Sequence, residues 1–143
     1  MIGTFNPLNI RTSCHYNWNG QQGSTRGFCN FESIVFCRRA GAYLLMRSYR
    51  RAGVYTIADI IKRWAPPSEN NTNAYIEYVS KRAGIKADSK LVFDADYCAV
   101  LAAMEIFEQG VPVVKRETYF YDTIASYQTV INQFNINRYE VKG

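Results

Sequence analysis

Apolar side chains recur at three- and four-residue steps over most of the chain after residue 31, which is the spacing of amphipathic helices. Glycine, proline and asparagine interrupt this pattern and divide it into separate runs. The pattern predicts five helices, over residues 32–51, 56–65, 70–82, 94–109 and 117–134.

Residues that commonly cap helices stand at several of these boundaries. Thr56 precedes Asp59 by three positions, a close relative of the capping box in which a short acid replaces glutamate or glutamine. Asn70 or Asn71 can cap the third helix, and Asp94 is the expected cap of the fourth. These local signals place the helix starts independently of the apolar periodicity.

The first 31 residues lack the helical pattern and are rich in asparagine, glycine and threonine. They predict loops and at most a small β-hairpin that ends at "FCNF", residues 28–31. The expected fold class is therefore mainly α, with α+β left open. At 143 residues we expect one domain. It comprises a loop-rich segment 1–31, a helical body 32–134 and a tail 135–143.

Composition changes this picture at two points. The 15% aromatic content, with 11 Tyr and 8 Phe, is typical of surfaces that bind sugars or proteins, although a tyrosine-rich core explains it equally well. Charge is unevenly placed: seven arginines against a single acid, Glu32, leave +6 in residues 1–52, so the total of +5 leaves −1 for the rest. An arginine-rich half favours an anionic partner, and of these we do not expect a nucleic acid.

Several classes of site and location are not expected. The four cysteines, at 14, 29, 37 and 98, and the single histidine match no metal-ligand spacing, so we predict free thiols, no metal and no cofactor. No run of about 18 apolar residues exists, which argues against a membrane span. The N-terminus lacks the apolar core of a signal peptide. We therefore expect the chain to be made in a cytoplasm and to need another route if it acts outside.

Three polar loops contain the candidate binding residues. "NPLNIR" (6–11) presents two amides and a guanidinium, and "NWNGQQG" (17–23) an indole beside a glutamine amide. "APPSENNT" (65–72) holds polar groups on a rigid proline pair. Such groups hydrogen-bond sugar hydroxyls and carboxylates, and tryptophan stacks on sugar rings. Each loop also has a purely structural explanation, as a turn, a core anchor or a helix connection. The candidate substrate-binding residues are Asn6, Asn9, Arg11, Trp18, Gln22, Glu69 and Asn70.

Glu108 breaks a local rule, because a carboxylate at a helix C-terminus faces the negative end of the macrodipole. It is followed by Gln109, Gly110 and Pro112. Such a residue is either a solvated helix end or a candidate catalytic acid.

The three polar loops and the segment around Glu108, "AAMEIFEQG", together resemble a family of small phage and prophage proteins that are labelled virion structural proteins. "NPLNIR…WNGQQG…GFCNF", "IIKRWAPPSENNTNAYIEYV" and "AAMEIFEQG" are the blocks that match, over about residues 3–112. This resemblance implies that neighbouring virion proteins are partners. It also implies that the protein is phage-encoded and lies in the virion or in the host cytoplasm.

"EQG" followed by Pro112 is also similar to the catalytic block of lytic transglycosylases, in which one glutamate ends a helix and serves as acid and then base. The resemblance implies a lysozyme-like helical domain with Glu108 as the catalytic residue. Two departures stand against it: Gln109 replaces the usual serine, and the sugar-binding loops precede the glutamate, as in a circular permutation. A hydrolase would need a second carboxylate, for which Glu69, Glu105 and Asp122 are the candidates.

Two functional hypotheses follow. The first is a phage-encoded muralytic protein, a glycosidase or lytic transglycosylase that acts on the peptidoglycan glycan strand. The second is a non-catalytic virion protein that uses the same loops to bind its neighbours. An open groove that joins Glu108 to Trp18 and the asparagines would favour the first.

Overall fold

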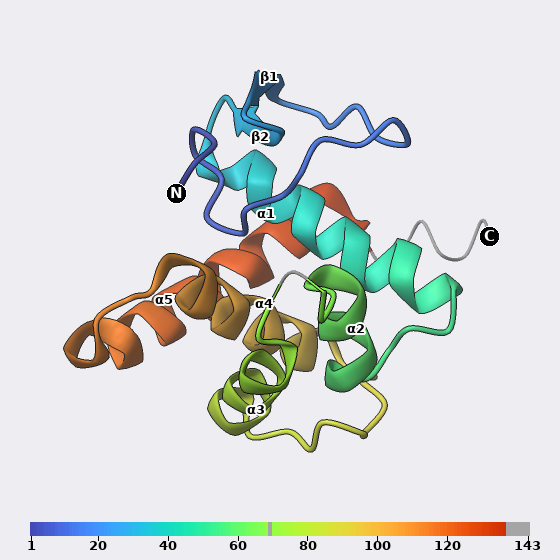
Figure 1. The fold of residues 1–143 in the computed structure, drawn as a ribbon, viewed down its shortest axis with the longest axis vertical. Coiled ribbons are helices and arrows are strands. Elements are labelled where there is room, and N and C mark those ends of the chain that lie inside the picture. Colours follow the sequence, from blue (N-terminus) through green and yellow to red (C-terminus); the bar gives the residue numbers. More distant parts are fainter. Residues whose placement is uncertain (69, 137–143) are drawn as a thin grey trace.

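The computed structural model describes residues 1–68 and 70–136, and Figure 1 shows its course. Glu69 and the tail from residue 137 onward lie outside the described residues, so the binding role predicted for Glu69 has no structural counterpart here. The elements, in chain order, are β1 (Gln21–Thr25), β2 (Phe28–Phe31), α1 (Ile34–Tyr43), the π-helical η1 (Leu44–Tyr49), α2 (Ile57–Trp64), α3 (Thr72–Ala83), α4 (Asp94–Gln109) and α5 (Val113–Phe134).

The mainly helical fold with one small antiparallel hairpin confirms the predicted fold class. In the hairpin, Gln21 pairs with Phe31, and Ser24 with Cys29, with an irregularity in register between Gln21 and Ser24. Cys29 and Phe31 are buried and alternate with half-buried neighbours, because successive side chains of a strand point to opposite faces. The buried face of β2 therefore joins the hairpin to the helical body.

Most helix boundaries follow the predicted caps. The Thr56 hydroxyl accepts a hydrogen bond from the Asp59 amide at 3.2 Å, and Asn71, not Asn70, caps α3 through the Ala74 amide. The predicted cap at Asp94 is wrong by one residue, since Phe93 is the N-cap and Asp94 is the first helical residue.

The last helix starts earlier than predicted. α5 begins at Val113, directly after its N-cap Pro112, and not at residue 117. Pro112 has an extended ψ of 141°, and proline disfavours helical backbone in the residue before it, so the helix begins directly after this position.

α4 lies at the centre of the molecule (Figure 1). It packs against α5 on one side and α3 on another, and α1 crosses both α4 and α5. Residues 100–106 of α4 are buried without interruption, and all of them except Glu105 are apolar, as expected of a helix enclosed by other elements. No helix within the described ranges combines the length and hydropathy needed to cross a bilayer.

The N-terminal loop is held against α1 by apolar side chains. Leu8 and Ile10 are buried, and Leu8 packs beside the helical glycine Gly41 so closely that a Cβ there would overlap its Cδ1 atom. A helix without a side chain at this position leaves room for the Leu8 side chain to pack directly against it. This contact fixes the loop that carries Asn9 and Arg11.

Candidate functional site

A single groove of about 340 Å³ gathers residues from both ends of the chain. Its walls come from the N-terminal loop, the hairpin, η1, the end of α2 and the end of α4. The lining residues are Ile2, Asn9, Ile10, Arg11, Ser13, Tyr16, Trp18, Phe28, Leu44, Tyr49, Trp64, Ala65, Asn70 and Glu108. Aromatic rings and amides dominate, and Glu108 is the one carboxylate among the described residues of this lining.

Glu108 lies in the last turn of α4, half-buried, and its Oε1 atom accepts a hydrogen bond of 2.9 Å from the Asn9 side-chain amide. Asn9 adopts a left-handed backbone conformation, with φ of 53°. Its backbone N–H donates to the backbone carbonyl of Asn6 at 3.1 Å. Asparagine tolerates this conformation better than most residues. The turn therefore presents the Asn9 side chain directly to the carboxylate.

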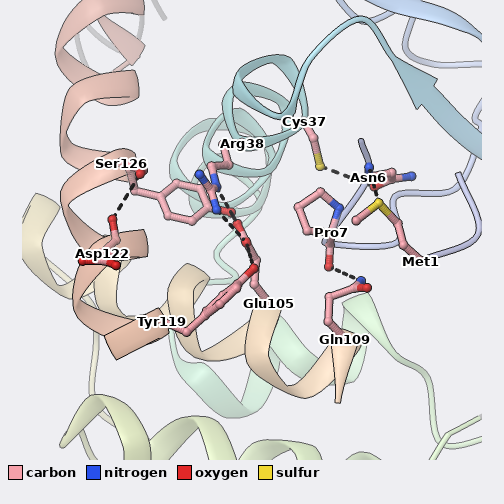
Figure 2. A network of polar contacts seen from close by, with 11 residues as sticks. Met1, Asn6, Pro7, Cys37, Arg38, Glu105, Gln109, Tyr119, Asp122 and Ser126 are labelled. Atoms are coloured by element: carbon pink, nitrogen blue, oxygen red, sulfur yellow. Dashed lines mark hydrogen bonds and ion pairs between the residues drawn. The ribbon is translucent and has the colours of Figure 1, made fainter. Parts of the chain in front are cut away.

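A second contact ties the end of α4 to the same loop. Gln109 Nε2 donates to the Pro7 carbonyl at 2.6 Å, and Figure 2 shows the amide directed at that oxygen. Gln109 stands where the lytic transglycosylase block usually has serine. Its length is what reaches the loop, so the departure from that block has a local structural role.

Asn6 does not line the groove, contrary to the predicted binding role. Its side chain is fully buried, where Nδ2 donates to the carbonyls of Ile10 (2.9 Å) and Cys29 (3.0 Å). Its Oδ1 accepts from the Ile10 amide at 2.9 Å and from the Cys37 thiol at 3.4 Å. Asn6 thus supplies backbone groups with partners and braces the loop, a role that a buried asparagine fills because its amide both donates and accepts.

The other predicted binding residues divide between groove and surface. Arg11, Trp18 and Asn70 line the groove together with Asn9. Gln22 lies on the exposed face of β1 and outside the lining. Trp18 stacks on Tyr16 with ring centroids 4.4 Å apart and is only 8% exposed, so it offers an edge and not an open platform.

Tyr75 of α3 lies behind Glu108 and is fully buried. Its hydroxyl has no hydrogen-bond partner among the described residues, yet it is near enough to interact with the Glu108 carboxylate. Burial, followed by the negative charge of Glu108, raises the pKa of Tyr75 well above its ordinary value. The Tyr75 ring stacks on Phe107 at 4.1 Å. Glu108 therefore has an apolar, aromatic wall on its inner side.

Glu105 is wrong as a second groove carboxylate, because it points into the core with no exposure. Arg38 donates to both of its oxygens, at 2.9 and 3.0 Å, and the Tyr119 hydroxyl donates at 2.8 Å (Figure 2). The Tyr127 hydroxyl also donates to it, at 2.6 Å. All four donors saturate the carboxylate, which makes it a structural group. Asp122, the other described candidate, is exposed on α5 and outside the groove lining.

This network changes the ionisation of its members. Burial raises the pKa of both Tyr119 and Tyr127, and the Glu105 charge raises it further. For Arg38, burial lowers the pKa, but the hydrogen bonds and charge of Glu105 outweigh it and raise the pKa. The raised pKa values keep both tyrosine hydroxyls and the Arg38 guanidinium protonated, so that each can donate to Glu105. No cluster of three or more potential metal ligands occurs within residues 1–68 and 70–136.

Several lining residues escaped the sequence analysis. Tyr49 and Trp64 fall inside the predicted helices 32–51 and 56–65, and Phe28 falls inside the predicted hairpin. Only Tyr16 carried a usable signal, since it is a second aromatic two residues from Trp18 in a loop rich in asparagine. The others reach the groove through packing between elements, which periodicity does not report.

Comparison of the sequence with known proteins identifies a relative from a phage. The sequence matches no established protein-family model. It is 37% identical over 123 residues to Protein P5 of Pseudoalteromonas phage PM2, an alignment that covers 83% of this chain and 73% of that protein. The expected membership in a phage protein family is thereby confirmed. The chain belongs to the phage protein family that includes Protein P5 of Pseudoalteromonas phage PM2.

Proposed function

We propose that this phage-encoded protein is a muralytic enzyme that cleaves glycosidic bonds of the peptidoglycan glycan strand. The observation that carries the proposal is the groove: Glu108, at a helix end, faces an open cavity with Asn9, Asn70, Arg11 and Trp18. The glutamate at the end of α4 matches the position of the acid in the lytic transglycosylase block. We take the domain to be lysozyme-like, with its sugar-binding loops placed before the acid in the chain.

The composition of the groove suits an amino sugar. Half-buried rings of Tyr49 and Trp64 offer faces and edges for the apolar side of a pyranose. Asn70 and Ser13 are exposed on the rim, where amide and hydroxyl groups hydrogen-bond to sugar hydroxyls and N-acetyl groups. A cavity of about 340 Å³ lies within the usual range of ligand pockets, roughly 300–1,000 Å³.

The chemistry requires one carboxyl group that donates and then accepts a proton. Glu108 protonates the glycosidic oxygen while the bond from that oxygen to the anomeric carbon breaks. A water molecule or a hydroxyl of the same sugar then bonds to the anomeric carbon and returns a proton to Glu108. Asn9 is a positioning residue, since its amide holds the carboxylate at 2.9 Å.

The first test is Glu108→Gln, which keeps size and polarity and removes the transferable proton. We expect cell-wall clearing to fall about 100-fold or more, the usual scale of general acid–base catalysis. The matched control is Glu77→Gln on the exposed face of α3, which should leave clearing unchanged. Product analysis identifies the second step: a new reducing end indicates water, and an internal anhydro linkage indicates the sugar's own hydroxyl. A fully active Glu108→Gln protein would remove this residue as the acid.

A second candidate is a non-catalytic virion component that binds neighbouring virion proteins. Val113 and Val114, at the start of α5, are 74% and 91% exposed, and large exposed apolar side chains are typical of protein contact sites. Purified particles that contain the protein, together with a wild type inactive on every peptidoglycan, would favour this candidate. Protein found only in the host cytoplasm would disfavour it.

A further inference from the structure

The groove holds two charged residues of opposite sign. Among the described lining residues these are Arg11 and Glu108, and neither forms an ion pair with any described residue. Within the described part of the chain, both charges therefore lack an ion-pair partner in one cavity. An enzyme acid explains Glu108, but a bare glycosidic bond is neutral and gives Arg11 nothing to recognise.

Arg11 is held in place by its backbone and by its side chain. Residues 10–12 run antiparallel to residues 27–29: the Cys29 amide donates to the Ile10 carbonyl at 2.9 Å, and the Thr12 amide to the Gly27 carbonyl at 2.8 Å. The Arg11 guanidinium carbon lies 4.7 Å from the centre of the Phe28 ring. Stacking uses the flat face of a guanidinium and leaves the N–H groups around its edge free to donate.

This arrangement differs from that of other arginines in the first third of the chain. Arg38 donates from both Nε and Nη2 to Glu105. Arg39 lies over the Phe134 ring with its Nε buried. Arg11 is exposed and lines the groove. Its planar fork matches a carboxylate, to which it donates two parallel hydrogen bonds.

We infer that Arg11 forms a carboxylate subsite, and that the carboxylate it takes belongs to the peptide stem attached to the glycan strand. This inference rests on the proposed function and deepens it, because it names the part of the substrate that lies beside the scissile bond. Stem peptides carry free carboxylates, whereas the glycan backbone of peptidoglycan, once stripped of stems by an amidase, offers only the one on each lactyl group. Neutral chitin oligomers offer none.

The test measures binding and cleavage separately. Binding uses the inactive Glu108→Gln protein, so that the ligand survives, with a stem-bearing muropeptide, the same muropeptide with amidated carboxyls, and a neutral chito-oligosaccharide. We expect the acid form to bind about tenfold or more tightly than the amidated form, because charge-assisted hydrogen bonds are lost on amidation. Added salt should reduce this preference, since exposed ion pairs are screened.

Substitution then locates the effect. Arg11→Gln should abolish the preference, and Arg11→Lys should restore part of it as a point charge without the fork. Arg26→Gln is the matched control, since Arg26 is an exposed arginine at the turn of the same hairpin and outside the groove lining. It should bind like its parent protein. Equal binding of the acid and amidated forms would overturn the subsite, even if the wild type cleaves peptidoglycan.

Two further outcomes separate the proposals. Binding that depends on Arg11, together with a wild type that cleaves nothing, would retain the subsite and overturn the proposed catalysis. A glycan strand stripped of its stems by an amidase carries only lactyl carboxylates, so it distinguishes the two sources of this group. Tighter binding of that polymer than of the muropeptide would overturn the assignment to the peptide stem.

Discussion

Glu105 and Glu108 stand one turn apart on α4 and have opposite environments. Glu105 is completely buried and receives four hydrogen bonds from Arg38 and two tyrosines. Glu108 is half-buried and receives one, from Asn9, at the mouth of a cavity. A carboxylate with every lone-pair direction used has little capacity for chemistry, while one with free oxygen atoms in a groove retains it. The difference between a structural and a reactive acid lies in the partners and not in the residue type.

Two buried tyrosines provide a prediction at this scale. Tyr127 donates to the buried Glu105 carboxylate at 2.6 Å, whereas the Tyr75 hydroxyl has no partner among the described residues. Tyr127→Phe should lower the free energy of unfolding by about 1.5–3 kcal/mol, the worth of a hydrogen bond to a charged group. Tyr75→Phe should leave it unchanged or raise it, because an unpaired buried hydroxyl is itself unfavourable.

Urea unfolding of both variants beside the wild type measures the difference through the denaturation midpoints. The two substitutions remove the same atom from equally buried rings, so each is the control for the other. A fall in midpoint for Tyr75→Phe as large as that for Tyr127→Phe would contradict the prediction and would indicate that the Tyr75 hydroxyl has a partner in solution.

At the scale of elements, the π-helical segment Leu44–Tyr49 shapes the groove. Leu44 and Tyr49 both line it, although they are five positions apart. In a regular α-helix such residues point about 140° apart, since each residue turns by about 100°. The wider π turn, with bonds from i to i+5, brings them toward one face, and π segments recur at functional sites. The helix is thus deformed where it meets the cavity.

Gly41 in α1 provides the second prediction. Alanine is normally favoured over glycine in a helix by about 1 kcal/mol. Here the added methyl group would overlap Leu8, which is fully buried, so Gly41→Ala should instead destabilise the protein, by about 1–3 kcal/mol. The displaced loop carries Asn9, so clearing activity should fall as well.

Thermal unfolding of Gly41→Ala and of Gly41→Ala with Leu8→Val checks this. The smaller side chain of valine should recover part of the loss by making room for the methyl group. A rise in midpoint for Gly41→Ala alone would show that the loop does not rest on this helix face in solution.

At the scale of the molecule, the arginine-rich half is built into the fold. Guanidinium groups of this half lie over aromatic rings of other elements: Arg38 over Tyr127, Arg39 over Phe134, and Arg50 over Tyr97. Such contacts stabilise while leaving the charge partly solvated. These arginines therefore contribute to packing between elements, which argues against a general anion-binding surface. Arg11, which lines the groove, is the candidate for binding an anionic group.

The cysteines provide a prediction about the whole fold. All four are free, with Cys14 exposed and Cys29, Cys37 and Cys98 buried. Burial raises the pKa of the Cys37 thiol and, assisted by the Asp94 charge, that of Cys98 to about 12. At neutral pH these groups are therefore protonated and weakly nucleophilic, besides being shielded.

A thiol reagent should react fast with one group in the native protein and with four after denaturation without reductant. Cys14→Ser should abolish the fast reaction and leave three groups that react only as the structure opens. Two or more fast-reacting groups in the wild type would show that the buried helices open readily. Fewer than four in denaturant would indicate oxidation.

Much of the fold was determined by sequence patterns of short range. The steps of three and four residues, the caps Thr56 and Asn71, and the turn residues before "FCNF" specify helices and a hairpin because each pattern acts within a few positions of the chain. A local signal also identified the candidate acid, because Glu108 is a carboxylate at the helix C-terminus, where the macrodipole disfavours negative charge. Its role in catalysis stays a prediction until the substitution is measured.

Tertiary structure alone decided which polar residues meet. The hydrogen bond from Asn9 to Glu108 joins positions 99 residues apart, and no local pattern reports such a contact. The same docking buried Asn6 among backbone groups and turned Glu105 into the core, although both residue types usually lie at the surface. The reason is physical: local preferences depend on neighbours in the chain, whereas the partners of a side chain depend on which surfaces the apolar core brings together.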